Sequence, residues 1–208
     1  MNAHFNWLTF LQSLQSIAQA GLTYPGDKYD KERFQQLRDL TAEAMANVSG
    51  LPVEKVNELF CNETGFQTPK IDTRAVILND AKEILLVCEG TPEKWSLPGG
   101  WCEVTLAPAE NTIKEAFEEA GLRVTIERLI MTQWYANHNQ PPMAYGCLKL
   151  FYHCTALDGD FRPNIETTAA RYFAIDALPP LWENRNTADQ IRLAHHLATH
   201  PNLPPIWE

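Results

Sequence analysis

Residues 95–100 read Trp-Ser-Leu-Pro-Gly-Gly, and residues 114–122 read Lys-Glu-Ala-Phe-Glu-Glu-Ala-Gly-Leu. Glu115, Glu118 and Glu119 are spaced i, i+3 and i+4, so a helix would place their carboxylates on one face about 100° wide. Like charges on adjacent helical turns repel each other, and a bound divalent cation would reverse the sign of that interaction. The spacing therefore predicts a helix with one metal-binding face.

The opposite face of this predicted helix is apolar. Ile113, Ala116, Phe117 and Ala120 occupy it, and we expect them to pack on a core. Gly121 stands where a C-cap glycine belongs, so the helix should end there.

The chain is predicted to have two parts. Residues 1–62 carry three amphipathic helical patterns, residues 63–69 read as a linker, and residues 70–208 form the larger domain. In the larger domain, short apolar runs predict strands at 75–78, 84–88, 124–131, 147–154 and 171–175. A final helix should start at Thr187, where Gln190 completes a capping box. This order predicts a mixed α/β sheet with helices on both faces.

In the first part, the positions of glycine and proline residues predict where the helices begin and end. Gly21, followed by Pro25-Gly26, should end the first helix; the second should run over about 30–45, and Pro52 should open the third. Three amphipathic helices in so short a segment leave an apolar stripe that a second copy would cover, so we expect a homodimer. The alternative is a structural cap on the larger domain.

Composition restricts the possible partners. The net charge is −9, with 26 acidic and 17 basic residues, which argues against an extended nucleic-acid surface. The five cysteines lack C-x-x-C spacing, and we find neither a signal peptide nor an apolar run of membrane length. We therefore expect a cytoplasmic protein with free thiols and no membrane contact.

Residues 100–122 resemble the Nudix box, G-x5-E-x7-R-E-U-x-E-E-x-G-U, where U is a bulky aliphatic residue. The matching residues are Gly100, Glu115, Glu118, Glu119, Gly121 and Leu122, and the departures are Leu106, Lys114 and Ala116. The missing glutamate and arginine would have braced the loop against the helix. The resemblance implies a Nudix α/β/α sandwich. Residues 17–24 and 29–34 resemble a bacterial subfamily that has a small helical domain in front.

That subfamily contains hydrolases of X-linked nucleoside diphosphates. The resemblance implies a metal-dependent enzyme that cleaves a CDP-choline or ADP-ribose type compound to nucleoside monophosphate and phosphoryl-X, with Mg²⁺ or Mn²⁺. It implies that Glu115, Glu118, Glu119 and the Gly100 carbonyl bind metal. Glu118, Glu119 and Glu166 are the catalytic candidates. The alternative is a Nudix-fold nucleotide-binding regulator with little turnover, which the departure at Leu106 leaves open.

Five further residues are candidates for substrate binding: Arg74, Gly99, Glu103, Trp134 and His138. Arg74 lies in an apolar strand and needs an acceptor, which can be a phosphate or a partner carboxylate. The small Gly99 permits close approach of the backbone to a ligand. Trp134 and His138 precede a proline pair in a predicted loop, where stacking on a base and core packing are both open. Glu103 is also an alternative general base.

Overall fold

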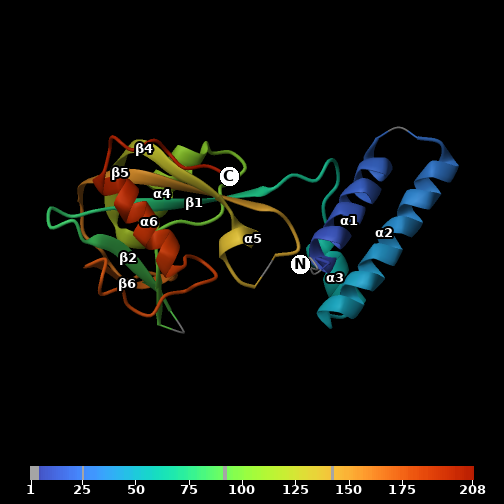
Figure 1. The fold of residues 1–208 in the computed structure, drawn as a ribbon, viewed down its shortest axis with the longest axis horizontal. Helices are drawn as coiled ribbons and strands as arrows, with labels where there is room; N and C mark the ends of the chain where they lie inside the picture. Colours follow the sequence, from blue (N-terminus) through green and yellow to red (C-terminus); the bar gives the residue numbers. More distant parts are fainter. Residues whose placement is uncertain (1–4, 25, 91–92, 142) are drawn as a thin grey trace. The chain divides into compact units, whose positions relative to one another are not determined.

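The computed structural model describes residues 5–24, 26–90, 93–141 and 143–208 (Figure 1). The chain divides into two compact units, Met1–Pro69 and Lys70–Glu208. The first unit is helical, and the second contains all the strands of the described residues. Between Phe60 and Lys70 the backbone is irregular.

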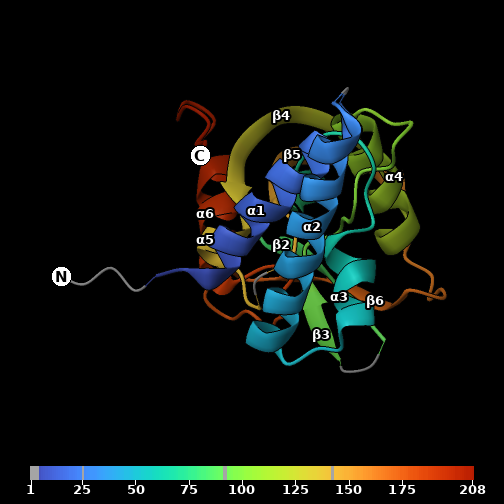
Figure 2. The same ribbon diagram turned by 90° about the vertical axis from the view of Figure 1, so that its right-hand side faces the viewer.

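The first unit consists of α1 (Trp7–Thr23), α2 (Lys28–Ser49) and α3 (Val53–Phe60). The helices α1 and α2 lie side by side, and α3 packs against α2 (Figure 2). Asp27 caps α2 by accepting hydrogen bonds from the backbone N–H groups of Tyr29 and Asp30, both at 2.8 Å. Gly50 ends α2 in a left-handed conformation, several residues beyond the predicted end of this helix.

We had predicted that Gly21 would end the first helix, but it does not. It lies inside α1, which continues to Thr23. A Cβ atom on Gly21 would lie 2.3 Å from the ring of Phe34 in α2. The glycine is therefore needed for close contact between the two helices, a tertiary requirement that local sequence does not reveal.

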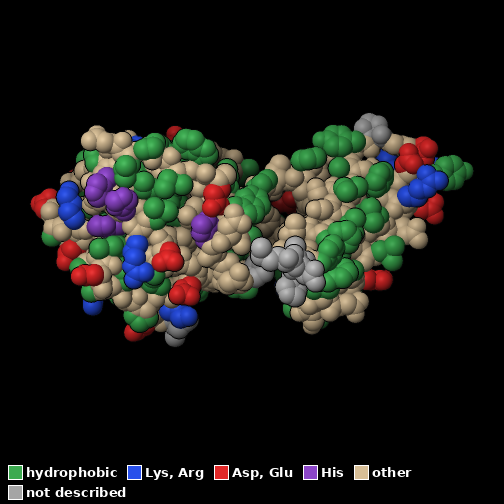
Figure 3. Space-filling view, in the orientation of Figure 1, with side chains coloured by type: hydrophobic (Ala, Val, Ile, Leu, Met, Phe, Trp, Pro, Cys, Tyr) green, Lys and Arg blue, Asp and Glu red, His purple; other side chains and the backbone are tan. Residues whose placement is uncertain are grey.

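Many large apolar side chains of the first unit are exposed, and Figure 3 shows a number of them on the surface of α1 and α2. Trp7 is 55% exposed and packs edge-on against Phe5 and Phe10. The exposed set in this unit comprises Phe5, Trp7, Phe10, Ile17, Tyr24, Tyr29, Leu40, Val48, Leu51, Leu59 and Phe66.

The second unit contains two three-stranded sheets. One has the order β1 (Lys70–Ile77), β5 (Cys147–Gly159), β4 (Leu122–Trp134), with β1 parallel and β4 antiparallel to β5. The other has the antiparallel order β3 (Lys94–Ser96), β2 (Ile84–Glu89), β6 (Thr167–Phe173). Each predicted strand overlaps an observed one, but Leu78 lies beyond the end of β1 and residues 174–175 lie beyond the end of β6; β3 was not predicted.

Successive side chains of β1 point to opposite faces of the sheet and pack in two separate hydrophobic cores. Val76 faces the cluster that contains Ile191 and Leu197 of α6 (Ala188–Thr199), whereas Ala75 and Ile77 face the cluster of α4 (Pro108–Ala120). The two helices thus cover opposite sides of the sheets, which confirms the predicted α/β/α fold. Within the described part of the chain, none of the helices combines the length and apolar character that a membrane crossing requires.

The buried face of α4 differs from our prediction. Ile113 is 37% and Phe117 is 56% exposed, and α4 is instead buried through a face that includes Glu119. Two residues with small side chains, Ala116 and Ala120, are fully buried there and let the helix approach the sheet closely. The prediction was right for Ala116 and Ala120 and wrong for Ile113 and Phe117, because the close packing distance selects the small residues.

Candidate active site

A cavity of about 470 Å³ lies where α4 faces the loop after β3. Six carboxylates line it together with two cationic side chains. The lining residues are Glu89, Gly99, Gly100, Trp101, Glu103, Lys114, Glu115, Glu118, Glu119, Glu166 and Arg185. The structure therefore brings together all predicted metal and catalytic residues.

The glycine loop runs directly beside β1. Thr73 donates its backbone N–H to the Gly100 carbonyl at 2.8 Å, and Ala75 donates to Pro98 at 2.8 Å. Gly99 has φ of +139°, and a Cβ there would lie 2.0 Å from the Thr73 carbonyl oxygen. Glycine is thus required at this position both by its dihedral angle and by space.

Glu119 joins the helix to this loop. Its Oε2 accepts the backbone N–H of Gly99 at 2.7 Å, and its side chain is almost fully buried. Burial raises the pKa of Glu119 to about 8; the charges of Glu115 and Glu89 add to the rise, while the Gly99 hydrogen bond and Arg74 oppose it. Burial likewise raises the pKa of Glu115.

Lys114 takes over a bracing role, although it departs from the arginine of the box. Its ammonium group donates a hydrogen bond to the Glu118 carboxylate. It also forms ion pairs with Glu103 at 3.2 Å and with Glu115 at 3.9 Å. Hydrogen bonding, first of all to Glu118, raises the pKa of Lys114. Lys114 therefore links the loop to the helix, a contact that the departure from arginine had put in doubt.

Glu166 reaches the cavity from the segment before β6. Asn164 donates its side-chain amide to the Glu118 carbonyl at 2.8 Å, and Thr167 donates its hydroxyl to the Glu119 carbonyl at 2.8 Å. Asn164 also accepts the backbone N–H of Glu166 at 2.9 Å. These bonds satisfy the C-terminal carbonyls of α4 and hold the exposed Glu166 beside the helix.

The donor set fits a divalent cation, because Mg²⁺ and Mn²⁺ prefer carboxylate oxygens as ligands and six carboxylate groups line the cavity. Burial raises the pKa of both Glu115 and Glu119, and a cation bound beside them would favour their charged forms. Still, within the described ranges no three His, Cys, Asp or Glu side chains are already arranged as a metal site. Glu118 is turned to Lys114 and Glu119 to Gly99 instead.

Arg74 is fully buried beneath the cavity. Its guanidinium group binds the carboxylate of Asp72 through Nε at 2.8 Å and Nη2 at 2.6 Å, and it donates to the Leu97 carbonyl at 3.1 Å. Lys149 also binds Asp72, at 2.7 Å. These contacts favour the ion pair over the phosphate clamp as the role of Arg74.

Trp134 and His138 lie outside the acidic cavity. They flank the start and the end of α5 (Tyr135–His138), where His138 Nε2 lies 2.7 Å from Glu208 Oε1. The backbone N–H of Trp134 donates to the same carboxylate at 2.9 Å. Their predicted contact with substrate finds no support in this geometry.

Sequence reasoning missed Glu89 and Arg185. Glu89 ends β2, and its carboxylate forms an ion pair with Arg185 at 3.2 Å. A polar residue directly after the apolar run 84–88 was a usable signal for Glu89. Arg185 comes from an irregular segment before α6 and carries no local signal, because only the tertiary fold brings it to the cavity.

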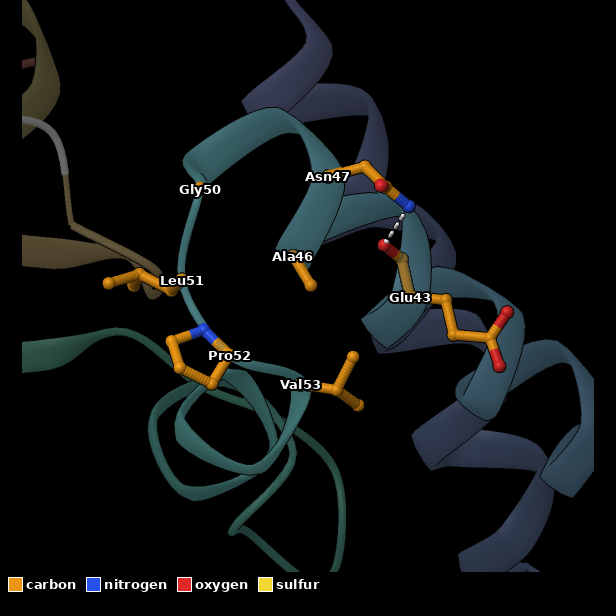
Figure 4. Close-up of a pocket in the computed structure, with 7 residues that line it drawn as sticks. All are labelled: Glu43, Ala46, Asn47, Gly50, Leu51, Pro52 and Val53. Carbon is orange, nitrogen blue, oxygen red and sulfur yellow. Dashed lines mark hydrogen bonds between the residues drawn. The ribbon is translucent and has the colours of Figure 1, made fainter.

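A second hollow, of about 730 Å³, lies in the first unit where α2 meets α3 (Figure 4). Glu43 is the only ionisable residue among the seven that line it, and its carboxylate points away from Gly50 and Leu51. Asn47 donates its amide to the Glu43 carbonyl at 2.9 Å, within the same helix. The hollow therefore lacks convergent polar groups.

Comparison with known families agrees with this geometry. The NUDIX domain model matches residues 68–194, and the model described as UDP-X-like, N-terminal oligomerisation domain, matches residues 6–60. The chain belongs to the Nudix family, and it is a pyrophosphohydrolase of that family.

Relatives match over nearly the full length. A putative ADP-ribose pyrophosphatase of Bacillus subtilis (strain 168), YjhB, is 41% identical over 97% of both chains. A solved structure of UDP-X diphosphatase is 34% identical, with a TM-score of 0.65 over 97% of this chain and 98% of the other. An ADP-ribose pyrophosphatase structure from Streptococcus suis 89-1591 is 39% identical, with a TM-score of 0.62. The match covers 68% of this chain and 100% of the other.

Proposed function

We propose that this protein hydrolyses the diphosphate of a nucleoside diphosphate linked to a group X, of the CDP-choline or ADP-ribose type. Water attacks one phosphorus atom, the bridging phosphorus–oxygen bond breaks, and nucleoside monophosphate and phosphoryl-X leave. Relatives described as ADP-ribose pyrophosphatase and UDP-X diphosphatase support this substrate class.

The observation that carries the proposal is the convergence of the α4 carboxylates with the Gly99-Gly100 loop in one cavity. Nudix hydrolases generally use divalent metals. In our proposal Glu115, Glu118, Glu119 and the Gly100 carbonyl hold Mg²⁺ or Mn²⁺. Such an ion neutralises charge on the diphosphate and activates water.

The remaining groups of the cavity have roles that follow from charge. Lys114 and Arg185 are its cationic side chains among the described residues, and both suit the non-bridging oxygens of a diphosphate. Glu166 is exposed and carries no ion pair in the structure of the described residues, so it is the best placed group to accept the proton of the attacking water. Glu103 is tied to Lys114 and is the second candidate.

A substrate panel tests the proposal. CDP-choline, UDP-linked sugars and ADP-ribose are incubated with Mg²⁺ or Mn²⁺, and the release of nucleoside monophosphate is measured by chromatography. We expect turnover of at least one compound and none with excess chelator. Tight binding of these nucleotides without any turnover would instead establish the regulator alternative.

A further inference from the structure

A second cavity in the larger unit adjoins the acidic one. Its volume is about 610 Å³, within the range of small-molecule sites. Trp101 and Glu103 line both cavities, so the two cavities are neighbours that share part of their walls. Beyond these two residues the wall is formed by Lys70, Ile71, Cys102, Val104, Leu106, Pro108 and Tyr145.

The wall presents aromatic rings to the cavity. Trp101 is 41% exposed, and its ring meets that of Tyr145 edge to face, with centroids 6.0 Å apart. Ile71, Leu106 and Pro108 add apolar surface. Every nucleobase has a π-face that stacks on such rings, whereas a ribose has no aromatic face to stack.

The backbone of the Trp101 segment is held firmly. Asn111 of α4 is fully buried and donates its amide to the Trp101 carbonyl at 3.3 Å and to the Thr73 hydroxyl at 2.9 Å. Its oxygen accepts the backbone N–H of Glu103 at 3.1 Å, and Cys102 donates its N–H to Ile71 at 2.8 Å. The cavity is thus largely pre-formed.

Two residues of the wall, Lys70 and Leu106, bear on which end of the substrate it accepts. The Lys70 ammonium lies 5.3 Å from the centroid of the Tyr145 ring and so occupies the position over this ring that a choline cation would take. Leu106 stands where the Nudix box has a glutamate, so Glu103 is the one carboxylate among the described residues of this wall, and it is paired with Lys114. Both features disfavour a cationic X and suit a flat, neutral ring.

We infer that this cavity binds the nucleobase of the substrate, with Trp101 as its stacking platform, while the diphosphate lies in the acidic cavity and X points away from Trp101. The inference rests on the proposed function, because it takes an X-linked nucleoside diphosphate as the ligand. It also gives the leucine at position 106 a reason, since a carboxylate there would be desolvated against the base.

Saturation-transfer NMR on intact CDP-choline, with chelator to prevent turnover, tests the inference. The full-length protein should transfer saturation to the cytosine ring protons more strongly than to the choline methyl groups. Trp101→Ala should raise the dissociation constant about tenfold, and Trp101→Phe should retain most of the affinity. Trp207→Ala is the matched control, because Trp207 is exposed and lies outside the cavity.

Stronger transfer to choline, an unchanged dissociation constant in Trp101→Ala, or absence of binding by the parent protein would overturn the inference. The proposed function fails separately. If the base protons are saturated in a Trp101-dependent manner but no compound of the panel is hydrolysed with metal, the base site stands and the hydrolase proposal falls. If a compound is hydrolysed with metal but its KM is unchanged in Trp101→Ala, the hydrolase proposal stands and the base site falls.

Discussion

Glu119 combines a structural and a chemical role within one side chain. Its carboxylate accepts the Gly99 N–H and is buried among other acids. A glutamine can keep the hydrogen bond, because its amide oxygen also accepts, but it cannot supply the charge that a divalent cation requires.

We therefore predict that Glu119→Gln lowers kcat/KM by roughly two to three orders of magnitude, the equivalent of several kcal/mol of lost charge stabilisation. Steady-state kinetics at saturating Mg²⁺ measures this loss. Glu110→Gln is the control, since Glu110 lies on the same helix and binds only the Ala107 N–H in the structure. Equal rates for the Glu119 variant and the parent would show that the metal site lies elsewhere.

The Asp72 carboxylate is shared by two buried cations, Arg74 and Lys149. We predict that Asp72→Asn lowers the free energy of unfolding by about 3–5 kcal/mol, because two buried positive charges lose their partner. Lys149→Met should cost far less, since Arg74 still pairs with Asp72. Chemical denaturation of both variants measures the difference, and equal losses would contradict this account.

The pH dependence of stability follows from Lys149. Burial lowers the pKa of Lys149 to about 8, from 10.5. Between these values the unfolded chain holds a proton that the folded protein has released, so this group makes the free energy of unfolding rise with pH. The parent should therefore gain stability relative to Lys149→Met from about pH 8 to 10.5, measured by denaturation at a series of pH values.

At the scale of elements, α4 and the loop 98–103 act as one unit. Asn111 links them through both ends of its side-chain amide, and Lys114 adds ion pairs from the helix to the loop. The carboxylates, the glycines and Trp101 therefore keep a fixed spacing only while this link is intact.

We predict that Asn111→Ala lowers the free energy of unfolding by about 1–3 kcal/mol, because it leaves buried partners without hydrogen bonds. It should also raise KM, since the loop then samples other conformations. Thermal unfolding and kinetics measure the two effects. Phe117→Ala on the exposed face of α4 is the control, and a similar loss of stability in that variant would mean that this face is covered.

The element α4 also shows what sequence could provide. The i, i+3, i+4 glutamates, the C-cap at Gly121 and the capping box at Thr187 are local patterns, and the structure has the helix ends where these patterns place them. The buried face of α4, the role of Gly21 and the arrival of Arg185 depend on packing between distant segments. Local periodicity carries no information on such distances, so these features required coordinates.

For the whole molecule, the exposed apolar surface of α1 and α2 points to association. This unit matches a model described as an oligomerisation domain, and we propose that residues 1–62 form a homodimer interface, with residues 63–69 as linker and 70–208 as the catalytic domain.

We predict that light scattering gives twice the 23.6 kDa mass of one chain, and that Ile17→Glu shifts the protein toward monomer. Ile17 is 54% exposed on α1, and a buried charge at an interface is costly. Leu157→Glu, at a residue of the larger unit that is 65% exposed, is the control. A monomeric parent at high concentration would contradict the dimer.

The parallel pairing of β1 with β5 has a consequence for the order of folding. Lys70 pairs with Cys147 and Ile77 with Cys154, so the central pair of strands joins segments that are far apart in the sequence. Contacts of this kind form slowly, because a long loop must close first. During synthesis the local α1–α2 pair is complete long before β5 emerges from the ribosome. In the dimer that we propose, two nascent chains would therefore associate through their helices before either has a catalytic sheet.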